Sequence, residues 1–184
     1  MGTKLSRREL LKVTAGLGLA AGPWFPAWAA AKSGVSVTRT EQTVRVEIDG
    51  TLFTEYHFQD AARPYFYPVI GPGGDPMTRN WPMKAVEHED QDHPHHRSLW
   101  YSHGNVNGHD FWEENTGHGR IVHDTFVETK SGAEVGVIVT RNNWVSDAGD
   151  VVCTDTRTHR FTSVSRGTLM DIDITFHASH GAVT

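Results

Sequence analysis

The feature that most constrains the fold of this chain is an alternation of apolar and polar residues at a period of two, which recurs from Ser33 onward. Val44, Val46 and Ile48 show it clearly, and Asp49-Gly50 follows them as a tight turn. This alternation is typical of strands with one buried face. No segment after Ser33 has a convincing helical period. The chain is therefore expected to fold from strands alone.

Long extended segments are separated by short turns through the rest of the chain. The expected strands cover residues 35–37, 44–48, 52–58, 64–70, 98–106, 121–129, 134–145, 151–164 and 168–178. Residues 76–97, rich in Pro, His and acidic side chains, are expected to form a long irregular loop. Antiparallel strands without alternating helices predict an all-β sandwich or barrel, and we expect an antiparallel β-sandwich. The last strand has nothing after it to cover its edge, so we expect the sequence to be part of a longer domain.

The N-terminal segment has the pattern of an export signal. Ser6-Arg7-Arg8 is typical of a twin-arginine signal, and an apolar stretch from Val13 to Ala21 follows it. Ala27-Trp28-Ala29 fits a cleavage site. We assign residues 1–31 to a signal peptide and residues 32–184 to the folded domain. This assignment predicts the twin-arginine export machinery as a partner, and a periplasmic or secreted location.

Charge and composition exclude several classes of protein. The formal charge is −5, and residues 1–30 contribute +3, so the chain after them carries −8. An acidic chain is a poor partner for nucleic acid. Its apolar runs are too short for an integral membrane span, which needs roughly 20 residues. The single Cys153 excludes an internal disulfide and a cysteine-rich zinc site.

Histidine is concentrated in one segment, with eight of the 12 histidines between His88 and His123. Pro94 predicts an extended backbone at His93, which would place His93 and His95 on one face and His96 on the other. If the following strand is regular, one polar face would be made by Tyr101, His103, Asn105, Asn107 and His109.

Three interpretations of this segment remain open. The first is a transition-metal site in which His93, His95 and His103 converge with Glu89 or Asp92. The second is a carbohydrate site, which needs planar apolar surfaces and fixed polar groups. The third is a structural loop without chemistry, the role also expected for the isolated His57, His159 and His177.

The carbohydrate interpretation assigns roles to particular residues. His95 or His103 would act as general base, Asp110 or Glu113 as its partner, and Arg97 would orient the ligand. The substrate-binding residues would be Trp100, Tyr101, Asn105, Asn107, His109 and Trp112. We expect a chain that processes or binds carbohydrate. The alternatives are a metal-dependent enzyme with a histidine and carboxylate site, and a non-catalytic binding or scaffolding module.

Several uncommon strings occur in a fixed order. They are Arg63-Pro64-Tyr65-Phe66-Tyr67-Pro68-Val69, Gly71-Pro72-Gly73-Gly74, Asp92-His93-Pro94-His95-His96-Arg97-Ser98-Leu99-Trp100, and His103-Gly104 followed by Val106-Asn107-Gly108 and Asp110-Phe111-Trp112. Over about residues 40–184 the chain resembles the PmoA-like exported bacterial proteins, labelled "methane oxygenase PmoA". The resemblance implies a chain that continues beyond Thr184.

The resemblance also implies an association with carbohydrate catabolism and a sandwich similar to the galactose-mutarotase-like supersandwich. Methane oxidation is not expected, because the subunit named in that label is an integral membrane protein and this chain has no segment that could span a bilayer.

Overall fold

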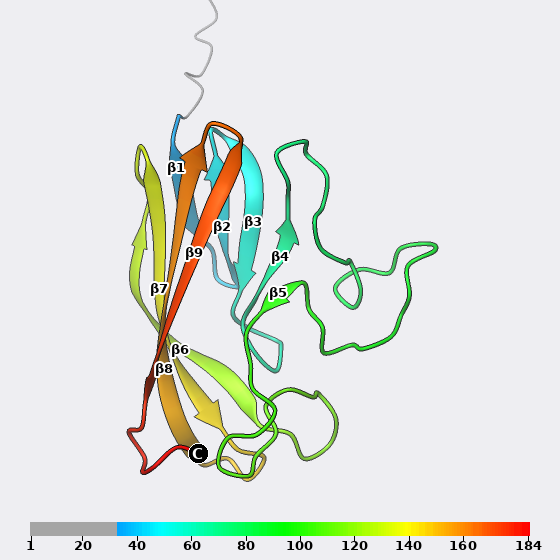
Figure 1. Ribbon diagram of the computed structural model, residues 1–184, viewed down its shortest axis with the longest axis vertical. Helices are drawn as coiled ribbons and strands as arrows, with labels where there is room; N and C mark the ends of the chain where they lie inside the picture. Colours follow the sequence, from blue (N-terminus) through cyan, green and yellow to red (C-terminus); the bar gives the residue numbers. More distant parts are fainter. Residues whose placement is uncertain (1–32) are drawn as a thin grey trace, which may run out of the picture. The chain divides into compact units, whose positions relative to one another are not determined.

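Nine strands follow one another along the described part of the computed structural model, residues 33–184, and no helix interrupts them there (Figure 1). Accordingly, this part of the chain contains no helix that is long and apolar enough to cross a membrane. The predicted export signal lies outside the described residues. The expectation of an all-β fold is confirmed.

The first sheet contains the first five strands in sequence order, and each strand pairs antiparallel with the next. These strands are β1 (Val35–Arg39), β2 (Thr43–Ile48), β3 (Thr51–His57), β4 (Tyr65–Val69) and β5 (Leu99–Trp100). Asp49 and Gly50 join β2 to β3 with positive φ angles of 50° and 78°. Two positive φ angles are the requirement of a tight type I′ hairpin turn, as the Asp-Gly pair predicts.

The second sheet is a four-stranded antiparallel meander. It contains β6 (Arg120–Lys130), β7 (Val135–Val145), β8 (Val151–Val164) and β9 (Gly167–His177). Hairpin turns at Ser131-Gly132 and at Ser165-Arg166-Gly167 join β6 to β7 and β8 to β9.

The two sheets pack face to face around an apolar core. Its buried members are Val35, Val44, Val46, Phe53, Tyr56, Phe58, Phe66 and Val69 from the first sheet and its loops, and Ile138 and Phe161 from the second. Close approach of β1 to β7 depends on Gly136, because a Cβ atom there would lie 2.4 Å from Cγ1 of Val35. The β-sandwich that the alternation predicts is therefore the fold of residues 33–184.

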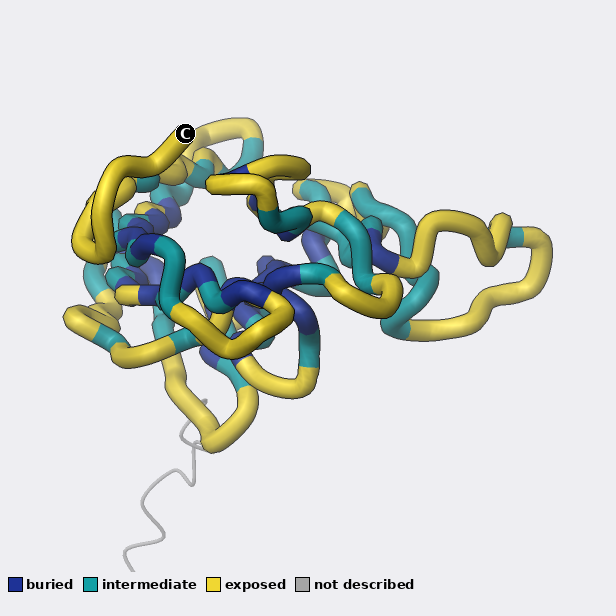
Figure 2. The backbone as a smooth tube through the Cα atoms, turned by 90° about the horizontal axis from the view of Figure 1, so that it is seen from below, coloured by how far each residue is buried: buried dark blue, intermediate teal, exposed yellow. Residues whose placement is uncertain are grey.

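Two long loops flank β5: one joins β4 to β5 within the first sheet, and the other joins β5 to β6 of the second sheet. Residues 70–98 form a largely exposed loop that projects from the sandwich, as the yellow tube in Figure 2 shows. The loop of residues 101–119 is anchored by Phe111, which packs with Ile121, Trp144 and Cys153 in a second buried cluster. The strand expected over residues 98–106 ends at Trp100, so the predicted extension beyond it is wrong.

Candidate functional site

Residues 93–96, here called the histidine turn, bring three imidazole groups together two residues before β5 begins. The backbone N–H of His96 donates to the carbonyl oxygen of His93 at 2.9 Å, and His93 has a φ of 39°. The chain therefore bends at His93, and the predicted extended backbone is wrong. The bend places one ring nitrogen from each of His93, His95 and His96 within 4.8 Å of the others.

His95 is the buried member of the turn and is held by a carboxylate. Its side chain is 7% exposed, and its Nδ1 lies 3.1 Å from Oε2 of Glu113. The ring of His96 lies perpendicular to that of His95, with centroids 4.3 Å apart. A carboxylate on Nδ1 fixes the orientation of an imidazole and leaves Nε2 available as a ligand or base.

Asp110 positions the residues that face the histidine turn. Its Oδ1 accepts a hydrogen bond from the backbone N–H of Trp112 at 2.7 Å and a longer one from that of Glu113 at 3.4 Å. Local bonds of this kind from an aspartate side chain shape a turn. Asp110 therefore orients the chain at Trp112 and Glu113.

An ion-pair network of Arg63, Arg97 and Glu114 lies next to the histidine turn. Arg97 donates through Nε and Nη2 to the two carboxylate oxygens of Glu114, at 3.0 and 2.9 Å. This interaction is the main cause that raises the pKa of Arg97. The guanidinium of Arg97 is therefore committed to an intramolecular partner, which differs from the predicted role of orienting a ligand.

Arg63 lies in the same network and is almost fully buried. It donates to the carbonyl oxygens of Glu113 at 3.0 Å and His95 at 3.4 Å, and its Nη1 lies 3.5 Å from Oε1 of Glu114. Burial lowers the pKa of Arg63, and the negative charge of Glu114 acts in the opposite direction. Arg63 thereby ties the histidine turn to the loop that bears Glu113.

An open groove of about 560 Å³ lies beside the histidine turn. We call it the tryptophan groove; it is lined by Thr78, Arg79, His96, Ser98, Leu99, Trp100, Tyr101, Ser102 and Trp112. The rings of Trp100 and Trp112 have centroids 4.6 Å apart. His96 belongs to both features, so a ligand in the groove would be next to the turn.

The surroundings of His96 favour its neutral form. Desolvation by neighbouring groups lowers its pKa, and the nearby His95, His93 and Arg79 lower it further. A neutral imidazole keeps a lone pair on one ring nitrogen, which is the form that binds a metal or accepts a proton.

A family model described as "Family of unknown function (DUF6807)" matches residues 43–184. The chain belongs to this family. No curated protein and no solved structure matches the chain.

The matched DUF6807 region spans β2 to β9 and includes the histidine turn and the tryptophan groove. Among the residues predicted from the sequence, the DUF6807 fold brings together His93 and His95 with Glu113, and Trp100 with Trp112. His96 joins the histidines although the sequence predicts it on the opposite face. The resemblance to PmoA-like proteins stays an expectation, because the DUF6807 match does not bear on it.

The other predicted polar residues of the DUF6807 chain lie apart from the histidine turn. His103 is not part of the three-histidine group, and its Nδ1 lies 3.0 Å from the carbonyl oxygen of its neighbour Asn105. Asn107 binds the backbone of Ala182 and Thr184, and His109 lies 3.4 Å from Asp147. The predicted common strand face is wrong, because Asn107 and Gly108 turn the chain with positive φ angles.

The two acidic residues proposed beside the metal have other partners. Glu89 accepts hydrogen bonds from the backbone N–H groups of Asn80 and Trp81, at 2.6 and 3.3 Å. Asp92 accepts one from Arg79 at 2.9 Å, and this bond is the main cause that lowers its pKa. Both carboxylates therefore shape the long loop.

Sequence reasoning missed Arg63 and the contribution of His96. Arg63 precedes Pro64 at the start of a predicted strand. Its partner Glu113 lies 50 positions further along the chain, and no local pattern of residues indicates that the Arg63 side chain will be buried against it. His96 was missed because its direction depends on the backbone angle at His93. The signal available was only the density of histidine in Asp92-His93-Pro94-His95-His96.

Proposed function

We propose that this chain is a metal-dependent enzyme whose histidine turn acts on a carbohydrate held in the tryptophan groove. The observation that supports this most directly is the convergence of ring nitrogens from His93, His95 and His96 within 4.8 Å. Three neutral imidazoles with an open fourth position form a ligand set used by catalytic zinc sites. Zinc, copper, iron and nickel all accept imidazole ligands.

The spacing of the three histidines fits such an ion after a small adjustment. Zinc binds nitrogen at about 2.0–2.1 Å, so tetrahedral ligand nitrogens are about 3.4 Å apart. His93 is more than half exposed, and rotation of its side chain can close the remaining gap. His95 is already held at Nδ1 by Glu113, so Nε2 is the atom that it would offer to the ion.

The carbohydrate part of the proposal rests on the groove beside the turn. Trp100 and Trp112 offer flat apolar surfaces, and Thr78, Arg79 and Ser98 offer polar groups around them. Sugar rings present an apolar face and hydroxyl groups, and sites that bind them combine aromatic surfaces with fixed polar partners. A bound metal would supply Lewis-acid polarisation or an activated water. The carboxylate of Glu113, which contacts Nδ1 of His95, would stabilise positive charge that develops on that imidazole.

Metal binding is tested by isothermal titration calorimetry of the purified chain with Zn²⁺. We expect about one equivalent to bind, with affinity lost in His95→Ala and in His96→Ala. Glu113→Gln should weaken binding by about 10- to 100-fold, which is the usual effect of removing the carboxylate partner of a ligand histidine. His103→Ala is the matched control and should bind as the wild type does. Equal losses in His103→Ala and His95→Ala, or no zinc binding to the wild type, would contradict the metal centre.

Carbohydrate binding is tested on a glycan panel with two variants of Trp112. Trp112→Ala removes the flat surface and should abolish binding, whereas Trp112→Phe keeps an aromatic ring and should retain part of it. If no glycan binds the wild type, or if both variants bind as the wild type does, the substrate class is wrong. A glycan that binds without being converted, with or without metal, would favour a binding module over an enzyme.

A further inference from the structure

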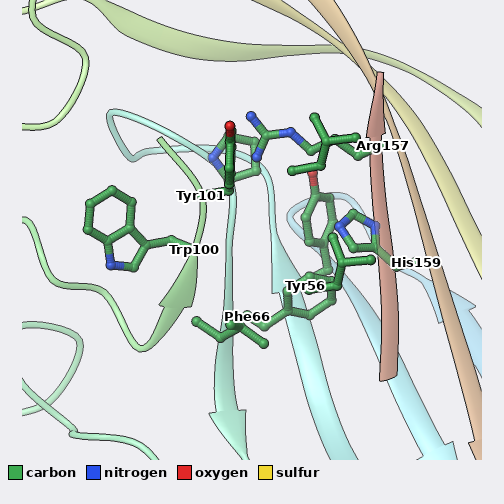
Figure 3. A pocket seen from close by; sticks show the side chains of 10 residues that line it. Tyr56, Phe66, Trp100, Tyr101, Arg157 and His159 are labelled. Atoms are coloured by element: carbon green, nitrogen blue, oxygen red, sulfur yellow. The ribbon is translucent and has the colours of Figure 1, made fainter. Parts of the chain in front are cut away.

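We propose that a cavity between the two sheets, separate from the histidine turn, is a binding site for an uncharged ring compound that carries hydroxyl groups. The cavity has a volume of about 370 Å³ and lies between β3, β4 and β5 on one side and β8 and β9 on the other (Figure 3). The residues that argue for a ligand are Tyr56, Phe66, Trp100, Tyr101, Arg157 and His159. Cavities of this size accommodate small organic ligands.

A buried ion pair fixes the charge of the cavity. Arg157 is 3% exposed, and its Nε and Nη2 both donate to Oδ2 of Asp155, at 3.0 and 2.8 Å. Asp155 is completely buried and also accepts hydrogen bonds from Asn142 and Trp144. The carboxylate therefore neutralises the guanidinium and holds it in place. Because the pair is balanced, Arg157 lines the cavity without adding net charge to the site.

Two further polar groups at the cavity are buried without a partner. The hydroxyl of Tyr56 and Nδ1 of His159 have no partner at hydrogen-bond distance and angle among residues 33–184, although Thr140 and the backbone of Ile138 lie near enough to affect the pKa values of the two side chains. In Figure 3 the Tyr56 hydroxyl is directed toward the Arg157 side chain, and the His159 ring lies beside it. Buried polar groups in native proteins are nearly always hydrogen-bonded, so such a pair calls for an explanation. A ligand that supplies oxygen atoms to both groups provides one.

Both unpartnered groups are uncharged near neutral pH. Burial raises the pKa of Tyr56 to about 12. Burial and the charge of Arg157 lower the pKa of His159 to about 3. With the ion pair balanced, the site carries no net charge. Burying a charged ligand there would leave its charge uncompensated, which is strongly unfavourable.

The remaining walls of the cavity are formed by aromatic and aliphatic side chains. Trp100 and Tyr101 lie on one side, and Ile172 and Ile174 of β9 lie on the other. Ile172 is 42% exposed, which is unusual for an isoleucine on the inner face of a sheet. The combination of apolar walls with an arginine, a tyrosine and a neutral histidine at one end matches a ring with one apolar face and a few hydroxyl groups. Neutral pyranoses and simple phenols share this chemistry.

The test is a saturation-transfer NMR screen of the purified chain with neutral pyranoses, simple phenols and the uronic acids that correspond to the pyranoses. We expect at least one neutral compound to bind and the matching acids to bind at least tenfold more weakly. Whether the compounds that bind are pyranoses or phenols shows which of these two classes supplies the ligand. If nothing binds, or if the acids bind as well as the neutral compounds, the proposal is overturned.

Two phenol-to-phenyl variants separate ligand binding from folding. Tyr56→Phe removes a hydroxyl that has no partner, so binding should weaken at least tenfold while the urea midpoint stays at or above that of the wild type. Tyr67→Phe removes a hydroxyl that donates to Asn80 at 2.8 Å outside the cavity, so it should leave binding unchanged. Unchanged binding in Tyr56→Phe would overturn the site. Trp112 lines the groove and not the cavity, so a compound bound in the cavity should bind Trp112→Ala as it binds the wild type. Zinc binding should be unaffected by Tyr56→Phe, so the cavity and the proposed function can fail independently.

Discussion

The carboxylate of Asp155 is completely buried, yet four donors satisfy it. Asn142 Nδ2 and Trp144 Nε1 donate at 2.6 and 2.8 Å, and Arg157 donates twice. A buried charge is tolerated only when paired and hydrogen-bonded. At the scale of single residues, this network therefore determines where the Arg157 side chain lies and holds the buried polar side chains of β7 and β8 together.

Asp155→Asn is expected to destabilise the fold strongly, because it leaves the Arg157 charge buried without an opposite charge. Removing one partner of a buried pair costs about 3–5 kcal/mol. Urea unfolding followed by tryptophan fluorescence measures the loss. Asp173→Asn is the matched control: its partner is Arg160, but both side chains are well exposed, so the loss should stay below about 1 kcal/mol. Equal effects of the two substitutions would mean that the buried network does not stabilise the fold.

His159 is expected to make stability fall in acid. Its pKa in the folded chain is lowered from the ordinary value of 6.5 to about 3, by burial first and by Arg157 second. Between pH 6.5 and 3 the His159 imidazole is protonated in the unfolded chain and stays neutral in the folded chain, so the free energy of unfolding decreases as the pH falls. The slope is at most about 1.4 kcal/mol per pH unit. Above pH 6.5 both states are neutral and His159 contributes no slope.

Urea unfolding between pH 7 and pH 4.5 tests this expectation. His159→Leu should remove its part of the slope, whereas His177→Leu, at an exposed position, should keep the wild-type slope. A slope that persists unchanged in His159→Leu would show that other groups cause the acid sensitivity.

At the scale of elements, the loop of residues 101–119 decides how the site is assembled. It holds Glu113 against His95, and it is anchored on the second sheet through the buried ring of Phe111. Gly119 allows this packing, because a Cβ atom there would lie 2.5 Å from the Phe111 ring. The Phe111 ring can pack at the start of β6 only because residue 119 has no side chain.

Gly119→Ala is expected to destabilise the fold by roughly 1–3 kcal/mol, the usual cost of overpacking. The displacement of Phe111 should also shift Glu113, so zinc affinity should fall in the same variant. Gly104→Ala, in the same loop, meets no atom closer than 4.0 Å and serves as the control. Thermal unfolding and zinc titration of both variants measure the two effects. A Gly119→Ala variant as stable as Gly104→Ala would contradict the packing argument.

At the scale of the whole molecule, the proposed metal centre would join segments from both sheets. The histidine turn enters β5 of the first sheet, and Glu113 belongs to the loop anchored on the second sheet. A ligand that binds only the folded chain stabilises it by mass action, by about 2.7 kcal/mol at 100 times its dissociation constant.

Zinc is therefore expected to raise the melting temperature by several degrees at saturating concentration, since 1 kcal/mol corresponds to about 2–4 °C for a chain of this size. Differential scanning calorimetry with and without Zn²⁺ measures the shift. His95→Ala should show no shift, and a chelator should reverse the shift of the wild type. A shift of the same size in His95→Ala would place the bound zinc elsewhere.

The sequence alone determined the strands and most of their turns. The alternation around Val44, Val46 and Ile48 and the Asp49-Gly50 pair are local signals, because side-chain period and turn angles depend on neighbouring residues. The same logic failed after Trp100, where positive φ angles at Asn107 and Gly108 turn the chain away from the expected strand.

Only the tertiary structure decided which functional groups meet. The direction of His96 depends on the backbone angle at His93, and the Glu113 carboxylate and the buried Arg63 reach His95 from 18 and 32 positions away along the chain. His159 reads as an isolated structural residue in the sequence, yet it lines a cavity because β8 faces β3 and β4 across the sandwich. Contacts between distant segments follow from how two sheets pack, and no local pattern of residues encodes that arrangement.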